Sequence, residues 1–333
     1  MNIAVLGAGA WGTAIACATS ARHSVVLHAR DRARAREIAS TRVNERYLPG
    51  VKLPASLVVS ADIDAAIEHA ARGLILLAAP TRALRESCRK LAAAAFSGPV
   101  AWLCKGLEEV DHRLAHEVVA EVWPQANGRS GPVSGPSFAL EVARGLPTAL
   151  TVAGSPGFCD VVTEALHGGA LRVYSTSDVI GVEIGGTVKN VLAIATGISD
   201  ALELGANARA ALITRGLAEM SRLGVALGAR HETFMGLTGV GDLILTATGD
   251  LSRNRRVGLA LGRGLTLEAA VAQLGHVAEG VRSAPAVLAR ARAAGIQMPI
   301  TESVCAVLAG DTTPRRALDL LLARDPKRES GDA

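Results

Sequence analysis

Lysine is scarce in this sequence, and clustered cysteines are missing. Only five of the 35 basic residues are lysines. The basic residues are dispersed, and no patch interleaves them with aromatic side chains, so a nucleic-acid partner is not favoured despite the net charge of +4. The five cysteines are scattered without a CxxC pair or a Cys/His cluster. That spacing predicts no metal site and fits a reducing compartment.

Signals for export and for a membrane span are missing as well. The N-terminus is apolar and alanine-rich, but it lacks a basic region and is interrupted by glycines. We find no run of about 18 uninterrupted apolar residues, the length that predicts a membrane helix. We therefore expect a cytoplasmic protein without membrane insertion, and its 333 residues are enough for two domains.

The chain opens on a nucleotide-binding pattern. Residues 2–6 predict a short strand, and Gly7-Ala8-Gly9-Ala10-Trp11-Gly12 follows as a G-x-G-x-x-G that leads into a predicted helix. Gly7 would allow the tight turn, Gly9 the approach of a pyrophosphate, and Gly12 the packing of helix on strand. The phosphates would meet the free amide groups at the helix N-terminus.

The end of the second predicted strand, residues 24–29, bears on the choice of cofactor. In this kind of fold a carboxylate there favours NAD, whereas an arginine favours NADP. Arg30 comes first here, and Asp31 and Arg32 follow it. This order favours NADPH without excluding NADH. Asp31 is equally suited to cap the next helix.

Strand patterns alternate with helical patterns through the first 180 residues. Further strands are predicted at residues 57–60, 74–78, 100–104, 133–134, 148–152 and 171–174. The alternation predicts a parallel sheet wound on both faces, with ligands beyond the carboxyl ends of its strands. Lys105 and the small-residue turn 134–139 follow two of those ends. We predict an α/β protein with a Rossmann-type doubly wound domain at 1–180 and an all-helical domain at 181–333.

One helix, Gly181–Leu202, is apolar on every face and should be buried. It carries Lys189 in its middle, and a desolvated lysine is typical of proton transfer. A lysine that extends to solvent from a helix end is the alternative. Gly185 and Gly186 lie about one turn before Lys189 and predict an open surface beside the amine.

Two polar segments follow in the helical half. Gly236–Leu243 predicts a glycine turn around Asp242. Ser252-Arg253-Asn254-Arg255-Arg256 could clamp an anion, or it could be a solvated basic face. The polar tail, residues 324–333, is predicted to be disordered.

The chain resembles the bacterial NAD(P)-dependent glycerol-3-phosphate dehydrogenases over nearly its whole length. The motifs that carry the resemblance are GAGAWGTA at 7–14, KGLE at 105–108, SGPSFA at 134–139, GTVKNVLAIATGISD at 186–200, GANARAALITRGLAE at 205–219, TFMGLTGVGDLILT at 233–246, SRNRR at 252–256 and VAEG at 277–280. The resemblance implies reversible hydride transfer between NAD(P)H and dihydroxyacetone phosphate, which yields sn-glycerol 3-phosphate for phospholipid synthesis. A homodimer is possible and is left open.

The resemblance also implies roles for individual residues. Lys189 matches the proton donor and acceptor of the family. Substrate contacts are implied for Lys105, Gly135, Ser137, Lys189, Asp242, Ser252, Arg253 and Asn254. Cofactor contacts are implied for Trp11, Arg30, Lys105, Ala139, Arg253, Val277 and Glu279, beside Gly7, Gly9, Ala10 and Gly12 of the glycine motif.

Two departures and two alternatives accompany this interpretation. Ala10 replaces a serine of many members, and the segment 21–24 is shorter than usual, which bears on the placement of Arg30. A β-hydroxyacid or 6-phosphogluconate-type dehydrogenase shares the G-x-x-x-K-N pattern of residues 185–190, although SRNRR and GVGD argue against it. A non-catalytic NAD(H) sensor would need the glycine turn but would have no use for a buried Lys189.

Overall fold

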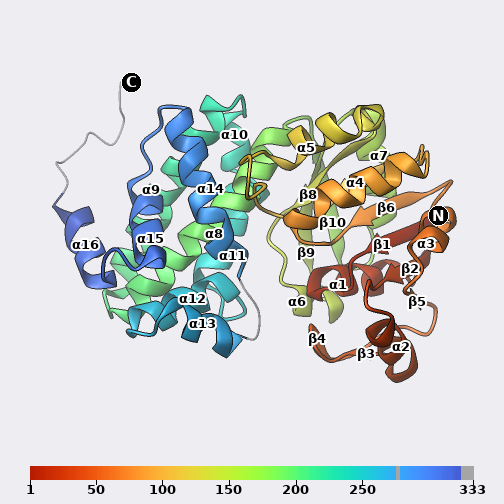
Figure 1. The fold of residues 1–333 in the computed structure, drawn as a ribbon, viewed down its shortest axis with the longest axis horizontal. Coiled ribbons are helices and arrows are strands. Elements are labelled where there is room, and N and C mark those ends of the chain that lie inside the picture. The colour runs from red at the N-terminus through yellow and green to blue at the C-terminus, as the bar shows by residue number, and fades with distance from the viewer. Residues whose placement is uncertain (275–277, 324–333) are drawn as a thin grey trace.

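The computed structural model describes residues 1–274 and 278–323, so Val277 and the tail 324–333 lie outside the described residues. Figure 1 shows two halves side by side. A sheet with helices on both faces forms one half, and a cluster of helices, coloured green to blue, forms the other. Helix α8 (Val179–Ala201) lies inside this cluster.

An eight-stranded sheet organises the first half. Its spatial order is β10-β9-β8-β7-β6-β1-β2-β5. The strands are β1 (Asn2–Leu6), β2 (Ser24–His28), β5 (Val58–Ser60), β6 (Leu74–Leu77), β7 (Val100–Trp102), β8 (Ser130–Ser134), β9 (Thr148–Ala153) and β10 (Leu171–Thr176). Since the chain places β2 on one side of β1 and β6 on the other, the strand order reverses beside β1, where such sheets bind ligands.

The apolar strands are explained by burial on both faces. Along β1, Ile3 and Val5 join one hydrophobic cluster, whereas Ala4 and Leu6 join another. Successive side chains of a strand point to opposite faces, so both faces of the sheet are covered. The helices that cover one face are α1 (Ala10–Thr19), α2 (Arg32–Thr41), α6 (Ala139–Ala143) and α7 (Pro156–Leu166). Those that cover the other are α3 (Ile63–His69), α4 (Leu84–Ala93) and α5 (Ala115–Val122).

The sheet departs from the predicted all-parallel order at one edge. β8 pairs with β9 in antiparallel fashion, and β10 runs parallel to β9, so the last two strands oppose the other six. An apolar run does not reveal its direction, because buried parallel and antiparallel strands have the same residue pattern. A hairpin of β3 (Val43–Asn44) and β4 (Leu48–Lys52) was also not predicted.

The second half is helical, as predicted, and is arranged around α8. Its further helices are α9 (Gly205–Ala226), α10 (His231–Phe234), α11 (Asp242–Thr248), α12 (Arg253–Gly262), α13 (Leu267–Leu274), α14 (Glu279–Ala293), α15 (Pro299–Ala309) and α16 (Pro314–Leu322). Among the described residues, only α8 is long and apolar enough to cross a membrane, but 83% of its most apolar window is buried inside the protein. It is therefore the core helix of this half, as expected from its apolar faces.

Candidate active site

Asp242 lies between two lysines that come from different halves of the chain. Its Oδ2 is 2.8 Å from Lys105 Nζ, and its Oδ1 is 2.6 Å from Lys189 Nζ. Lys105 follows strand β7, Lys189 is in the middle of α8, and Asp242 is the first residue of α11. The carboxylate is buried and the lysine side chains are 13% and 9% exposed. Charged groups so little exposed are rarely found without partners, and these three satisfy one another.

Lys189 retains one hydrogen-bond donor after its internal contacts. Its ammonium donates to Asp242 Oδ1 and, at 2.9 Å, to Thr246 Oγ1. The Thr246 hydroxyl in turn donates to the carbonyl of Asp242 at 2.7 Å. An ammonium has three N–H groups, so one is left for a ligand.

The surroundings of Lys189 lower its pKa. Burial is the main cause and brings the pKa to about 8, from 10.5; Asp242 opposes the shift and the charge of Lys105 adds to it. An amine with this pKa can both give and take a proton near neutral pH.

Gly185 and Gly186 do not leave open space beside the amine, contrary to the prediction. A Cβ at Gly185 would lie 2.3 Å from the carbonyl oxygen of Thr238. A Cβ at Gly186 would lie 2.9 Å from Ser134 Oγ and 3.5 Å from the stem of Lys105. The two glycines thus let a π-helical turn (Leu237–Gly241) and the Lys105 side chain pack closely against α8.

The segment before Asp242 also differs from the predicted turn. Asp242 begins helix α11 directly after the π-helical turn. Thr246 therefore lies one helical turn after Asp242, which is how both reach Lys189. Sequence reasoning missed Thr246, although a helix beginning at Asp242 would have pointed to it through the four-residue spacing.

Asn254 connects three helices beneath the site. Its Nδ2 donates to Asn190 Oδ1 at 2.9 Å, and its Oδ1 accepts from the backbone N–H of Gly280 at 2.9 Å. Ser252 caps α12 by accepting from the backbone N–H of Arg255. Both side chains are buried, and each keeps one N–H or O–H that these contacts do not use.

Two arginines of the segment 252–256 differ in their contacts: Arg255 is held by carboxylates, and Arg253 is not. Arg255 is bound to Asp200 at 2.8 Å and to Asp250 at 2.9 Å. Arg253 is exposed, and its guanidinium makes no hydrogen bond or ion pair within the described residues. The anion clamp predicted for the whole cluster can therefore not include Arg255 without breaking these pairs.

Glu279 shares the electrostatic environment of this centre. Burial raises the pKa of its carboxyl, and the positive charge of Arg253 acts in the opposite direction. Lys105 and Lys189 lower the pKa of Glu279 further. Three cations, Lys105, Lys189 and Arg253, thus face two carboxylates, and burial opposes the ionisation of one of them, Glu279. The centre can therefore accept an anion.

The turn after β8 brings Gly135 and Ser137 next to Lys105. The Lys105 ammonium lies 3.4 Å from the carbonyl oxygen of Gly135, which also accepts from the Ser137 hydroxyl at 3.0 Å. Gly135 has φ +130, and a Cβ there would lie 2.8 Å from the carbonyl oxygen of Ala149. Ala139 begins α6 and packs on the same hydrophobic cluster as Trp11.

The glycine motif fits a dinucleotide. Gly7 has φ +127, and its Cβ would lie 2.7 Å from the backbone of Ala78 at the end of β6. A Cβ on Gly12 would lie 2.0 Å from the carbonyl oxygen of Gly7, whereas at Gly9 nothing lies within 4 Å. Helix α1 begins at Ala10 and has no side-chain cap, so no side chain occupies its first amide groups.

The side chain of Asp31 caps the N-terminus of α2. Its carboxylate caps α2 by accepting from the backbone N–H groups of Ala33 and Arg34 at 2.9 and 3.1 Å. Arg30 and Arg32 are exposed on either side of it. The capping alternative for Asp31 is therefore correct, and the free positive charges at this strand end are arginines.

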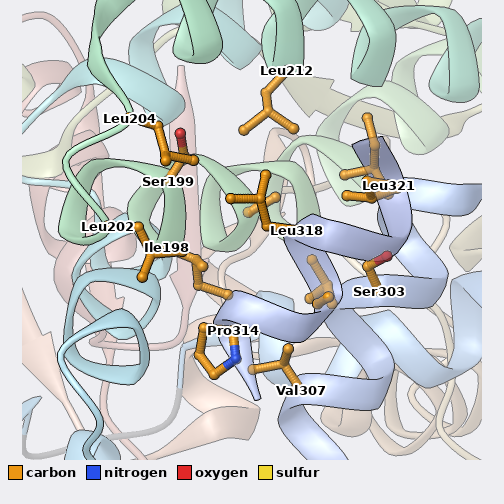
Figure 2. Close-up of a pocket in the computed structure, with 14 residues that line it drawn as sticks. Ile198, Ser199, Leu202, Leu204, Leu212, Ser303, Val307, Pro314, Leu318 and Leu321 are labelled. Carbon is orange, nitrogen blue, oxygen red and sulfur yellow. The ribbon is translucent and has the colours of Figure 1, made fainter. Parts of the chain in front are cut away.

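The rest of the described structure offers no metal site and one apolar pocket. Among residues 1–274 and 278–323 no group of three His, Cys, Asp or Glu side chains is placed to hold a metal ion. An apolar pocket lies between α8, α9, α15 and α16, and Figure 2 shows Ile198, Leu212, Val307 and Leu318 around it. Its lining begins at Ala195, roughly 9 Å along α8 from Lys189, and includes none of Lys105, Lys189 and Asp242, so it is not part of the same site.

Fold and site together define a class. A doubly wound sheet with a dinucleotide-type glycine turn, joined to a helical half that provides a buried lysine, is the arrangement of a nicotinamide-dependent dehydrogenase. Comparisons with known proteins narrow this class. Residues 2–157 match the family model described as NAD-dependent glycerol-3-phosphate dehydrogenase N-terminus, and residues 178–319 match that of its C-terminus. The chain belongs to the NAD-dependent glycerol-3-phosphate dehydrogenase family, and the resemblance found in the sequence is confirmed.

Individual members of the family are similar to this chain over nearly their full length. Glycerol-3-phosphate dehydrogenase (NAD(P)+) of Methylibium petroleiphilum is 57% identical over 99% of this chain and 98% of its own. The enzyme of the same name from Ralstonia nicotianae is 56% identical over 99% of both chains. The crystal structure of glycerol-3-phosphate dehydrogenase from Coxiella burnetii is 44% identical, covers 97% of this chain and 98% of its own, and superimposes with a TM-score of 0.91.

Proposed function

We propose that this protein is an NAD(P)-dependent glycerol-3-phosphate dehydrogenase that interconverts dihydroxyacetone phosphate and sn-glycerol 3-phosphate. The observation that carries the proposal is the buried Lys105–Asp242–Lys189 arrangement, in a chain of this family whose sheet half also carries a dinucleotide-type glycine turn. When bound, the nicotinamide supplies or accepts the hydride at the substrate carbon. The protein then has to bind the phosphate, orient the ketone and handle one proton.

Lys189 handles the proton. Its third N–H is the donor for the substrate oxygen, and the ammonium gives up a proton as the alkoxide develops. In the reverse direction the free amine accepts the hydroxyl proton. Asp242 and Thr246 hold the nitrogen in place through its other two hydrogen bonds.

The substrate phosphate is held by the second half of the chain. Arg253 has a free planar guanidinium that can bind two phosphate oxygens at once. The unused donors of Ser252 and Asn254 lie at the start of the same helix, α12. Lys105, Gly135 and Ser137 complete the substrate site from the sheet side.

The cofactor is held by the first half of the chain. Gly7 and Gly12 allow the close packing of the turn and of α1, and Gly9 leaves room for the pyrophosphate at the start of α1. Ala10 offers a backbone amide there in place of a serine hydroxyl. Arg30 binds the adenosine end, and NADPH is favoured because Asp31 is occupied as a helix cap. The further cofactor contacts are Trp11, Lys105, Ala139, Arg253, Val277 and Glu279.

The biological setting follows from this activity. We propose two domains, 1–180 and 181–333, a cytoplasmic location, and a role in supplying glycerophosphate for phospholipids. A homodimer is the assembly to be tested.

The test is oxidation of NADPH and NADH with a panel of ketones. Dihydroxyacetone phosphate should be reduced by the protein, and 3-oxoacids and 6-phosphogluconate should not react in the corresponding assays. Turnover of the acids instead would favour the β-hydroxyacid type, and cofactor binding without turnover of any substrate would favour a sensor.

A further inference from the structure

Glu183 is a buried carboxylate whose partners all belong to the other half of the chain. It lies in the second turn of α8 and is 8% exposed. Its Oε1 accepts from the indole N–H of Trp102 at 3.0 Å and from the backbone N–H of His116 at 2.9 Å. Its Oε2 lies 2.6 Å from His116 Nδ1. One side chain of α8 is thus fastened to both β7 and α5.

The same short segment that binds Glu183 also carries Lys105. Trp102 is the last residue of β7, and Lys105 follows three residues later with its ammonium on Asp242. Along α8, Gly186 lies between Glu183 and Lys189, and the Lys105 stem passes close to it. The position of α8 against β7 therefore sets the position of Lys189 relative to Lys105.

The packing between α8 and the sheet is incomplete next to the contact of Lys105 with Gly186. A small cavity lies between Glu183 and Lys105, lined also by Ser134, Gly186 and Thr187. The hydroxyls of Ser134 and Thr187 are buried without hydrogen-bond partners within the described residues. Where packing is incomplete, directional hydrogen bonds to a charged group decide the geometry.

We propose that Glu183 is a positioning residue of the dehydrogenase reaction: its bonds to Trp102 and His116 hold α8 at the distance from β7 at which Lys105 and Lys189 share Asp242. The expected effect on kcat rests on the proposed function. The statement that Glu183 fixes the distance between α8 and β7 does not depend on it.

The charges around Glu183 are consistent with an anchored ion pair. Burial lowers the pKa of His116, but the hydrogen bond and charge of Glu183 outweigh it, and the net shift is upward. Glu117 raises the pKa of His116 further, and Arg290 of α14 acts against it. Burial raises the pKa of Glu183 itself, and its bonds to His116 and Trp102 oppose this.

Loss of the Glu183 hydrogen bonds should change the pKa of Lys189. If α8 moves away from β7, the charge of Lys105 recedes and water enters the cavity. Both changes raise the pKa of Lys189, because burial and the charge of Lys105 are what lower it. A displacement of about 1 Å at a reacting group can cost up to about a hundredfold in rate.

The test uses Glu183→Gln and Glu183→Ala, with Glu219 as the matched control. Glu219 is also buried and accepts three hydrogen bonds, from Ile300 N and from the N–H and hydroxyl of Thr301, but all its partners lie in the helical half. The measurements are the melting temperature, kcat, the cofactor Kd and the pH midpoint of glycerol 3-phosphate oxidation. Labelling of the Lys189 amine by acetic anhydride across pH, read by mass spectrometry, gives its pKa without any substrate.

For the Glu183 variants we expect kcat to fall at least about tenfold, with the pKa of Lys189 moved upward in both assays and the cofactor Kd nearly unchanged. Glu219→Gln should lower the melting temperature while kcat and the pKa of Lys189 stay as in the wild type. If the Glu183 variants behave like the Glu219 control, the role of Glu183 is structural only and the proposal is overturned.

The proposal can still be tested if the Glu183 variants do not fold or if the wild type lacks the expected activity. If the Glu183 variants do not fold, Trp102→Phe removes one of the three bonds and keeps an aromatic ring. It should move the pKa of Lys189 in the same direction, and an unchanged pKa would count against the proposal. If the wild type does not oxidise glycerol 3-phosphate, the proposed function fails, but the labelling experiment still decides whether Glu183 positions Lys189.

Discussion

Lys105 and Lys189 hold opposite oxygens of a single carboxylate, that of Asp242, at 2.8 and 2.6 Å. Two ammonium groups therefore lie close together in a nearly buried place with one negative charge between them. Lys105 contributes to the low pKa of Lys189 through this proximity. A phosphorylated substrate would bring further negative charge to a centre that has an excess of positive charge.

The pH dependence of turnover should report the Lys189 amine. With a pKa of about 8, the protonated form needed for ketone reduction is lost as the pH rises through about 8, and the free amine needed for alcohol oxidation is gained over the same range. We expect kcat/KM for reduction to fall and kcat/KM for oxidation to rise through this region. Steady-state rates in both directions between pH 6 and 10 check this, and two profiles that change in the same direction would contradict it.

Lys189→Ala should abolish turnover and spare cofactor binding. The side chain lies on α8, whereas the glycine turn belongs to the sheet half, so the two functions are spatially separate. A group that transfers the proton usually contributes about 10²–10⁴-fold. Measured kcat above about a tenth of the wild-type value would remove Lys189 from the proton transfer. Fluorescence titration with NADPH serves as the control for folding.

Arg253→Lys should impair use of the phosphorylated ketone even though it keeps the charge. A lysine cannot form the two parallel hydrogen bonds of a guanidinium with phosphate. The loss should appear in kcat/KM for dihydroxyacetone phosphate, since binding of the remote phosphate orients the ketone. Arg256→Lys, exposed on the same helix, is the matched control. An equal loss with unphosphorylated dihydroxyacetone would show that Arg253 is not the phosphate anchor.

Arg30→Ala should weaken NADPH binding more than NADH binding. Arg30 is exposed at the end of β2, and the neighbouring Asp31 is committed to the cap of α2. The affinities of both cofactors for Arg30→Ala and for Arg32→Ala test the assignment. Equal losses of both cofactors in Arg30→Ala, or a selective loss only in Arg32→Ala, would move the role away from Arg30.

Ser199→Ala should stabilise the protein. The Ser199 hydroxyl is buried beside the apolar pocket of Figure 2 and has no hydrogen-bond partner within the described residues. Its removal should raise the free energy of unfolding by about 0.5–1 kcal/mol, since a buried unpaired polar group is costly and alanine favours a helix. Thr196→Val on the same helix should instead cost about 1 kcal/mol, because Thr196 donates to backbone carbonyls of Ala193 and Ala247. Urea denaturation of both variants decides between these signs.

Local patterns predicted much of the fold but little of the contacts inside the site. Apolar runs located every strand of the main sheet and the central helix, because burial on all sides leaves a clear pattern. They did not reveal that β9 and β10 run in the opposite direction, because buried parallel and antiparallel strands have the same apolar pattern. The bond between Lys105 and Asp242 joins residues 137 positions apart, and no spacing rule relates them. Glu183 was passed over as one polar residue among apolar neighbours, because its partners Trp102 and His116 come from another part of the chain.

The burial of α8 also has a consequence for the order of synthesis. The helices that surround α8, namely α9, α11, α12 and α14, all follow it in the sequence, and the last of them ends at Ala293. At about 5–20 residues per second, a ribosome needs roughly 5–20 s to make them after α8 has been completed. During that time an apolar segment long enough to span a bilayer has emerged without its final cover. Apart from the part that packs on β8 and α5 of the first half, the apolar surface of α8 therefore has no cover until its own partner helices have been made.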